Sequence, residues 1–339
     1  MRELVVFFSS ILTPLVIYLV LKRTTDKEMV KVFIKAILIV CTLSSIIGIY
    51  QFFVDPLFIR VGAEREAFSG LLRTSGVFNA EYTQAYFLII GTFITLFAVR
   101  SRLLKYNLVI LFLVGIVLTF HRMSWVVLIL LSILYFIEVK KKKVWQMITL
   151  GVFAIVFVFL FFPPFVPIIK TGFMESPFVR ERLLADTISG RLTLDKTLLK
   201  ELPKNWLIGV GSVQSDVFYN TLLDAGWSED YALGKQGLAI HNEFLLIGFF
   251  YGIPVLFLFS SFLISCLSYF WKKSKEKSKF FFITTLYIIL FIIANLSNMF
   301  PLYSHIGLLL AILLGMSVAI YRKNIDVNDL ILNEHIKVK

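Results

Sequence analysis

Acidic residues are missing from the places where an ion-coupled carrier would need them. The sequence has 22 Asp and Glu residues, and none lies in the middle of a long apolar run; Glu81, Glu138 and Glu243 stand near the ends of such runs. Carriers coupled to protons or sodium ions usually need an acid within the membrane, or a repeated pair of interrupted helices. The sequence contains neither feature and therefore does not favour such a carrier.

Cysteine is scarce, and the glycines form no nucleotide-binding pattern. The two cysteines, Cys41 and Cys266, both lie within apolar runs, which implies neither a disulfide nor a metal site. No Walker or Rossmann glycine pattern occurs, and no pair of Asp residues suggests a divalent metal. We therefore expect a function that uses neither a metal nor a cofactor.

Apolar residues dominate what is present. Of 339 residues 58% are hydrophobic, 35 are Phe, and the mean hydropathy is +0.84. Repeated apolar runs of about 20 residues are typical of transmembrane helices. The net charge of +12 would suggest nucleic acid for a soluble protein, but basic links on the cytoplasmic side of a membrane explain it better. The composition predicts an all-α transmembrane bundle.

The apolar runs predict about nine membrane spans with a defined orientation. The spans are expected at 4–21, 33–54, 80–99, 106–121, 123–138, 144–162, 241–270, 280–297 and 302–321. Every second link is rich in Lys and Arg, so these links are expected to face the cytoplasm. The N-terminus then lies outside and the C-terminal tail inside. The first run is followed by Lys22 and Arg23 and has no small-residue cleavage site, which favours a retained anchor.

This topology divides the chain into five parts, one of which is a large extracytoplasmic loop. The parts are 1–79 (first spans and external link), 80–162 (central spans), 163–240 (the large loop), 241–321 (last spans) and 322–339 (cytoplasmic tail). Long loops usually have a function. Leucines at helical spacing predict an amphipathic helix at 191–202 that stops at Pro203. Ser215 as a cap and Gly226 as a stop predict another at 215–225, and both are expected to rest on the membrane surface.

Two arginines and a histidine on the external side are the candidate catalytic residues. Arg122 lies between two apolar runs, either as a turn residue that reaches the headgroups or as a cation held to meet phosphate oxygens. Arg191 alone is compatible with an ordinary solvated loop. His241 opens a long apolar helix, whose N-terminal partial positive charge favours a neutral imidazole that can accept a proton.

Together the motifs of this part of the chain resemble one family, the bacterial O-antigen ligase and polymerase superfamily. The matching pieces are His121-Arg122-Met123-Ser124-Trp125, Gly190-Arg191, Leu207-Ile208-Gly209-Val210-Gly211, His241-Asn242-Glu243-Phe244-Leu245 and, earlier, Arg73-Thr74-Ser75-Gly76-Val77-Phe78. Each motif is weak alone, and their order and spacing carry the resemblance. They cover about 73–260.

The sequence departs from the family pattern in three places. The family usually has Ser-Arg-Gly where this chain has His121-Arg122-Met123, and often Asn-Pro-Asn where it has Ala80-Glu81-Tyr82. The tryptophan that commonly follows the loop arginine is replaced by Asp195 and Lys196. These departures concern the positioning of the substrate more than the type of reaction.

The resemblance implies a glycosyltransferase of the outer leaflet of the bacterial cytoplasmic membrane. Family members transfer a glycan from an undecaprenyl-diphosphate carrier to an acceptor hydroxyl. By this resemblance, Arg122 and Arg191 would bind the diphosphate leaving group, and His241 would act as the general base in an inverting, metal-independent reaction. Substrate-binding roles would fall to Arg73, Asn242, Glu243, Gly209 and Gly211.

Two other classes of function compete with the glycosyltransferase. A flippase or other transporter of lipid-linked oligosaccharides would also need a basic groove, open across the membrane. A non-catalytic assembly scaffold would leave His241 dispensable. The sequence leaves open whether the acceptor is another carrier-linked glycan, as in a polymerase, or a lipid or wall hydroxyl, as in a ligase. It also leaves open the sugar and the oligomeric state.

Overall fold

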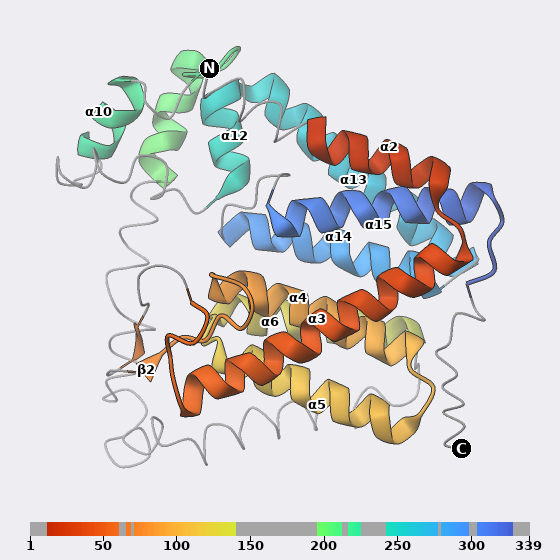
Figure 1. Ribbon diagram of the computed structural model, residues 1–339. Helices are drawn as coiled ribbons and strands as arrows, with labels where there is room; N and C mark the ends of the chain where they lie inside the picture. The colour runs from red at the N-terminus through yellow and green to blue at the C-terminus, as the bar shows by residue number, and fades with distance from the viewer. Residues whose placement is uncertain are drawn as a thin grey trace, which may run out of the picture. The chain divides into compact units, whose positions relative to one another are not determined.

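The computed structural model describes residues 12–60, 66–68, 71–139, 195–211, 216–224, 242–276, 279–297 and 304–327. These residues are predominantly helical, which confirms the helical fold class (Figure 1). The chain divides into two compact units. Unit 1 comprises Met1–Ser132, Cys266–Phe291 and Phe300–Lys339, and unit 2 comprises Ile133–Ser265 and Ile292–Met299.

Unit 1 contains most of the long helices. They are α2 (Thr13–Thr24), α3 (Lys27–Phe53), α4 (Glu81–Ala98), α5 (Arg102–Leu118), the start of α6 (Arg122–Val139), the end of α13 (Ile253–Glu276), most of α14 (Lys279–Ser297) and α15 (His305–Arg322). The helices α3, α4 and α5 pack against one another, and α2 packs along α15 (Figure 1).

Several helices of unit 1 begin where the sequence provides a capping side chain. Asp26 accepts a hydrogen bond from the backbone amide of Met29 at 2.8 Å and so starts α3. Ser304 accepts one from Gly307 at 3.1 Å and starts α15. These side chains satisfy backbone amides that have no partner within the helix.

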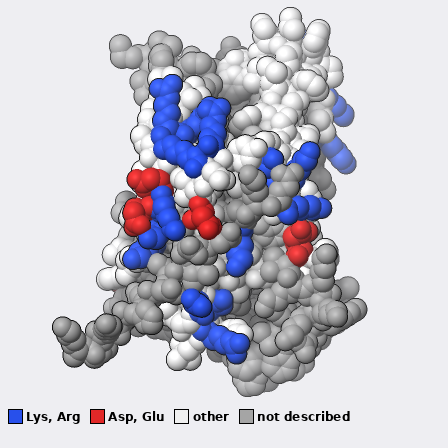
Figure 2. All heavy atoms as spheres, turned by 90° about the vertical axis from the view of Figure 1, so that its right-hand side faces the viewer, with Lys and Arg blue, Asp and Glu red and all other residues white. Residues whose placement is uncertain are grey.

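The basic links of unit 1 gather at one end of the unit. Lys323 at the end of α15 donates to the carbonyl of Thr25 between α2 and α3, at 2.9 Å. Lys273 at the end of α13 lies over the ring of Tyr321 in α15. Phe97, near the end of α4, contacts Phe282, near the start of α14, so the basic link that follows α4 lies beside the one that precedes α14. Figure 2 shows Lys and Arg side chains gathered on this face. The basic links after α2, α4 and α13 and the basic end of α15 therefore lie at the same end of unit 1, whereas the predicted basic link Lys140–Lys143 lies outside the described residues.

Four described helices are long and apolar enough to cross a membrane. They are Lys27–Phe53, Ile253–Lys275, Lys279–Leu296 and His305–Arg322. The helices α4, α5 and α6 occupy three further predicted spans. The predicted span 144–162 and residues 4–11 of the predicted span 4–21 lie outside the described residues, and α2 occupies the rest of that first span. The expected number of about nine spans thus stays a prediction.

Two expectations from the sequence need correction. The apolar run 241–270 predicted one helix, but the structure has two, α12 (Glu243–Tyr251) and α13, separated at Gly252. In the first external link, where no strand was expected, β1 (Glu66–Phe68) pairs antiparallel with β2 (Leu71–Leu72).

Unit 2 contains the described part of the large loop. A helix over 195–201 continues as the 3-10 turn η4 (Leu202–Asn205), so the helical path runs past Pro203, where the sequence predicted a stop. The helix α10 (Asp216–Asp224) agrees with the helix predicted at 215–225. The same unit includes α12 and the first part of α13.

Candidate functional site

A folded-back loop, 73–79, forms the centre of the polar cluster in unit 1. Gln51 of α3 holds it with both ends of its amide: its Oε1 accepts from the backbone amides of Ser75 and Gly76, each at 2.9 Å. Its Nε2 donates to the carbonyls of Gly76, at 3.1 Å, and Phe58, at 2.9 Å. The loop therefore has its backbone partners within the bundle, as non-helical backbone among membrane helices requires.

The same loop is bonded to α4 and α5. Gln84 of α4 donates to the carbonyl of Ser44 at 3.1 Å and accepts from the hydroxyl of Thr74 at 3.4 Å. The amide of Thr74 donates to the carbonyl of Leu118, the last residue of α5, at 3.3 Å. Three helices thus fix the position of the loop.

Gly76 is the residue that lets the loop approach α3. Its φ is +56°, and an added Cβ would lie 2.1 Å from Ser44 Oγ and 2.6 Å from the Ser44 carbonyl. Any side chain would therefore clash with the backbone of α3 as well as adopt a strained conformation. Gly76 thus allows the segment 73–79 to fold back against α3 before α4 begins.

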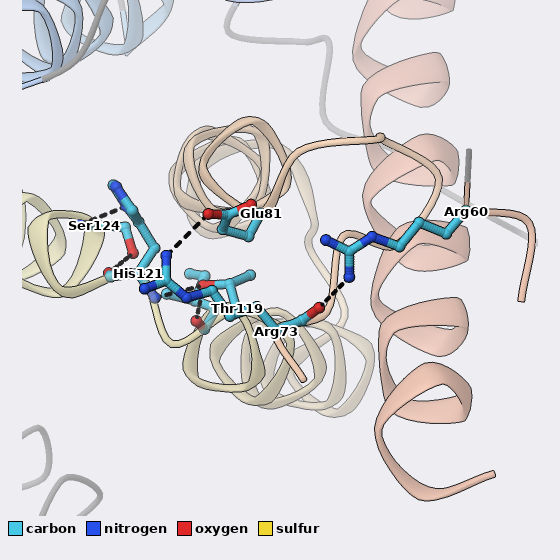
Figure 3. Close-up of polar contacts among 7 residues, drawn as sticks. Arg60, Arg73, Glu81, Thr119, His121 and Ser124 are labelled. Carbon is cyan, nitrogen blue, oxygen red and sulfur yellow. Dashed lines mark hydrogen bonds and ion pairs between the residues drawn. The ribbon is translucent and has the colours of Figure 1, made fainter. Parts of the chain in front are cut away.

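Arg73, a predicted substrate-binding residue, forms an ion pair with Glu81. Arg73 Nη1 lies 2.9 Å from Glu81 Oε1, and the side chain of Glu81 is only 2% exposed. Arg60 donates from Nη1 to the carbonyl of Arg73 at 2.8 Å. In Figure 3 the guanidinium of Arg73 points toward Glu81 and away from Arg60. Glu81 thus compensates the charge of Arg73 within the cluster.

His121 starts α6 by using its imidazole as a cap. The backbone amide of Ser124 donates to His121 Nδ1 at 3.3 Å, and the Ser124 hydroxyl donates to the His121 carbonyl at 2.6 Å (Figure 3). A nitrogen that accepts from an amide carries no proton, so the proton of neutral His121 lies on Nε2. The family pattern has Ser here, a favoured capping residue. In this chain the imidazole of His121 makes the capping contact.

Aromatic rings connect this cap to α4. The ring of His121 meets those of Tyr86 and Tyr82 edge-on, with centroids 5.5 Å and 6.3 Å apart. Phe120, just before His121, has a φ of +50°, which is uncommon for a bulky residue. Arg122 follows as the first residue of α6. Arg73, Glu81, His121 and Arg122 therefore lie at one end of unit 1.

This cluster lies at the end of unit 1 opposite the basic links. It is formed where α3 and α5 end and where α4 and α6 begin, whereas the described basic links lie at the start of α3 and between α4 and α5. The ring of Phe78 also contacts that of His305, the first residue of α15. The polar cluster and the described basic links therefore lie at opposite ends of unit 1, as expected if external and cytoplasmic links alternate along the chain.

A second site candidate, in unit 2, is the loop 205–211 with the break between α12 and α13. The amides of Val210 and Gly211 donate to the carbonyls of Phe249 and Phe250, at 3.0 and 2.9 Å. The amide of Ile253 donates to the carbonyl of Trp206 at 2.7 Å. The loop thus bonds backbone groups on both sides of the helix break.

Two glycines make this contact possible. Gly209 has a φ of +67°, and a Cβ there would lie 2.4 Å from the backbone of Phe250. Gly252 has a φ of +90°, and its Cβ would lie 2.4 Å from the carbonyl of Leu207. Gly211 has a φ of +81° but open space around it. The backbone of the Gly-Val-Gly motif therefore packs directly on the backbone of α12. The amides of Val210 and Gly211 donate to carbonyls of α12.

Asn242 and Glu243 form the first turn of α12. Asn242 Oδ1 accepts from the amide of Leu245 at 3.1 Å and so caps the helix, and Glu243 is buried. Arg191 and His241 lie outside the described residues. The predicted convergence of Arg122, Arg191 and His241 on one substrate consequently stays a prediction.

Four residues of this network, Gln51, Gln84, Glu81 and His121, were not predicted from the sequence to bond one another or the loop. Gln51 and Gln84 carried a usable signal, because an amide within an apolar helix needs a partner. Across the described ranges, no group of three or more His, Cys, Asp or Glu could hold a metal ion.

The long apolar helices and the buried polar cluster at one end define a helical membrane protein. Within it, residues 107–260 match the family model described as O-antigen ligase, which confirms the resemblance to the O-antigen ligase and polymerase superfamily. The match indicates glycosyltransferase activity of this general type in a bacterial membrane protein. A comparison with curated proteins finds no match.

Proposed function

We propose that this protein transfers a glycan from an undecaprenyl-diphosphate carrier to the hydroxyl of an acceptor. The observation that supports this best is the family match over 107–260. The matched segment includes Arg122, Arg191 and His241, the three residues to which the proposal assigns the reaction. The acceptor is a second glycan, a lipid or a wall hydroxyl.

The reaction takes place on the extracytoplasmic side of the cytoplasmic membrane. The basic links of unit 1 lie at one end and the Arg73–His121 cluster at the other. By the positive-inside rule the basic end faces the cytoplasm. We retain the topology of about nine spans, with the break at Gly252 placed in the seventh.

Each of the proposed catalytic residues has a separate role in the reaction. Arg122 and Arg191 bind the diphosphate and stabilise the negative charge that develops as it leaves. His241 takes the proton from the acceptor hydroxyl as it attacks the anomeric carbon, which inverts that centre. The arginines supply the charge that a metal supplies to leaving diphosphates elsewhere, so the reaction proceeds without one. Arg73, Asn242, Glu243, Gly209 and Gly211 contribute to substrate binding.

The test is transfer from a purified lipid-diphosphate glycan to acceptor in detergent, with and without a chelator. His241→Gln keeps size and hydrogen bonding but cannot accept a proton at neutral pH, so we expect a rate loss of about 10²–10⁴-fold. Binding of the carrier lipid should persist in His241→Gln and weaken in Arg122→Gln. Full activity of His241→Gln would contradict the base assignment, and activity lost to the chelator would contradict metal independence.

The same assay separates the competing classes. A flippase would move the carrier lipid across vesicles and produce no glycoside, and a scaffold would do neither. Either result, obtained with protein that elutes as a single folded species, would overturn the proposed transfer reaction.

A further inference from the structure

Three consecutive large apolar side chains are exposed at the tip of the loop 205–211. Trp206, Leu207 and Ile208 are 53%, 58% and 77% exposed. Exposed apolar side chains in a contiguous group usually mark a contact surface. The neighbouring residues indicate what kind of surface these three side chains contact.

The tip cannot turn its side chains inward, because its backbone is bonded on both flanks. Trp206 accepts from Ile253, and the amides of Val210 and Gly211 donate to α12. The close contact of Gly209 with the backbone of Phe250 holds the same arrangement. The exposure of the three side chains is therefore a fixed property of unit 2.

The bond from Ile253 to Trp206 fixes the level of the tip relative to α13. Ile253 is the first residue of the candidate membrane span Ile253–Lys275, of which only 11% is buried within the protein. Phe257 and Leu258, one turn into that helix, are strongly exposed. The exposed tip is thus continuous with a helix face of membrane length and apolarity.

The order of side chains along the loop fits a water–lipid boundary. Lys204 and Glu201 form an exposed ion pair in the turn before the tip. Then come Trp206, a residue type enriched at membrane interfaces, and two aliphatic residues. A polar turn followed by Trp and aliphatic side chains is the arrangement expected of a segment that inserts shallowly into a bilayer.

We propose that Trp206, Leu207 and Ile208 insert among the lipids of the leaflet in which α13 begins and anchor the loop there. The occupant is bilayer lipid, and the contact does not depend on the proposed glycosyltransferase activity. By this contact the bilayer holds the Gly-Val-Gly segment and the start of α13 at a fixed depth.

The test uses the full chain with both native cysteines, Cys41 and Cys266, replaced by Ala. Ile208→Cys is labelled with an environment-sensitive NBD fluorophore, and Lys204→Cys, in the polar turn, is the matched control. The protein is reconstituted in phosphatidylcholine vesicles that contain no polyprenyl lipid. We expect blue-shifted emission at position 208, with several-fold stronger quenching by spin-labelled lipids and weaker quenching by iodide than at position 204.

Two outcomes would overturn the anchor. One is equal iodide quenching at both positions in protein that elutes as a single folded species. The other is a blue shift at position 208 that appears only after a polyprenyl diphosphate is added, which would make the carrier chain the occupant. A second readout needs no cysteine: brominated phosphatidylcholine should quench tryptophan fluorescence less in Trp206→Tyr than in the parent protein.

Discussion

The loops 73–79 and 205–211 both place non-helical backbone against apolar helices, but they satisfy it differently. The first depends on a side chain, since Gln51 supplies the acceptor for two amides of the loop and a donor for its Gly76 carbonyl. The second bonds main chain to main chain, with Gly209 and Gly252 allowing the approach. Side-chain amides can be replaced one at a time, whereas backbone contact leaves no room for a Cβ. The two loops should therefore respond differently to mutation.

The largest effect is expected in the backbone-to-backbone loop. In Gly209→Ala or Gly252→Ala the new Cβ meets backbone atoms at 2.4 Å, so the loop must separate from the helix break. We expect a loss of about 4 kcal/mol or more in unfolding free energy, the range reserved for severe disruption. The measurement is unfolding in mixed micelles titrated with SDS.

The matched control for this comparison is Gly211→Ala. Gly211 also has a positive φ, but nothing lies within 4 Å of an added Cβ. The Gly211→Ala variant should be destabilised only by the strain of a left-handed conformation, which costs about 1–2 kcal/mol. If Gly209→Ala and Gly211→Ala were equally stable, the close backbone contact would not be the reason for the glycine.

The next effect concerns Gln51 in the side-chain loop. Gln51→Leu keeps the volume roughly but leaves the buried amides of Ser75 and Gly76 without their acceptor. Each unsatisfied buried group costs about 1–3 kcal/mol. Thr92→Val is the control, because the Thr92 hydroxyl bonds only to the Leu88 carbonyl of its own helix. Equal stability of the two variants in the SDS titration would contradict the role of Gln51.

A smaller effect is expected from the ion pair. Glu81→Gln removes the charge that compensates Arg73, and we expect a loss of about 1–3 kcal/mol, below the range for fully buried pairs because Arg73 is partly exposed. The exposed pair of Glu28 and Lys31 supplies the control: Glu28→Gln should change stability by less than about 1 kcal/mol. An unchanged midpoint for Glu81→Gln would show that the pair contributes nothing.

The smallest effect tests the cap of α6. His121→Ala should lose about 1 kcal/mol of unfolding free energy, whereas His121→Asn, whose side-chain oxygen can accept from Ser124, should retain most of it. Should Asn prove as destabilising as Ala, the packing of the ring against Tyr82 and Tyr86 would account for His121 instead of the cap.

The sequence predicted the helices better than their interruptions. Apolar runs located α3 to α6, α14 and α15 because a membrane-length run leaves the backbone few alternatives. The break at Gly252 was missed because the sequence stays apolar on both sides of it, over 244–259. Gly252 followed by Pro254 is a usable signal, since proline favours the first turn of a helix over its interior.

The sequence predicted which kinds of residue form the site, but it did not predict which residues pair with one another. The Arg73–Phe78 motif marked this segment through the family resemblance, but nothing local indicates that Gln51, about 25 positions earlier, holds it. Such pairings depend on how α3, α4 and α5 pack, which one sequence does not encode in any short window. The pairing of Arg73 with Glu81, eight positions later, was missed for the same reason.

The attachment of the loop 73–79 to three helices has a consequence for biogenesis. The loop is synthesised after α3 but bonds to Gln84 of α4 and to the Leu118 carbonyl at the end of α5. Gln51 of α3 can pair with Ser75 and Gly76 as soon as the loop is made, but the Thr74 amide gains its partner only once α5 has entered the membrane. A chain stalled or truncated before Leu118 would leave this amide unpaired between α3 and α4, so the attachment of the loop is complete only after α5 is in place.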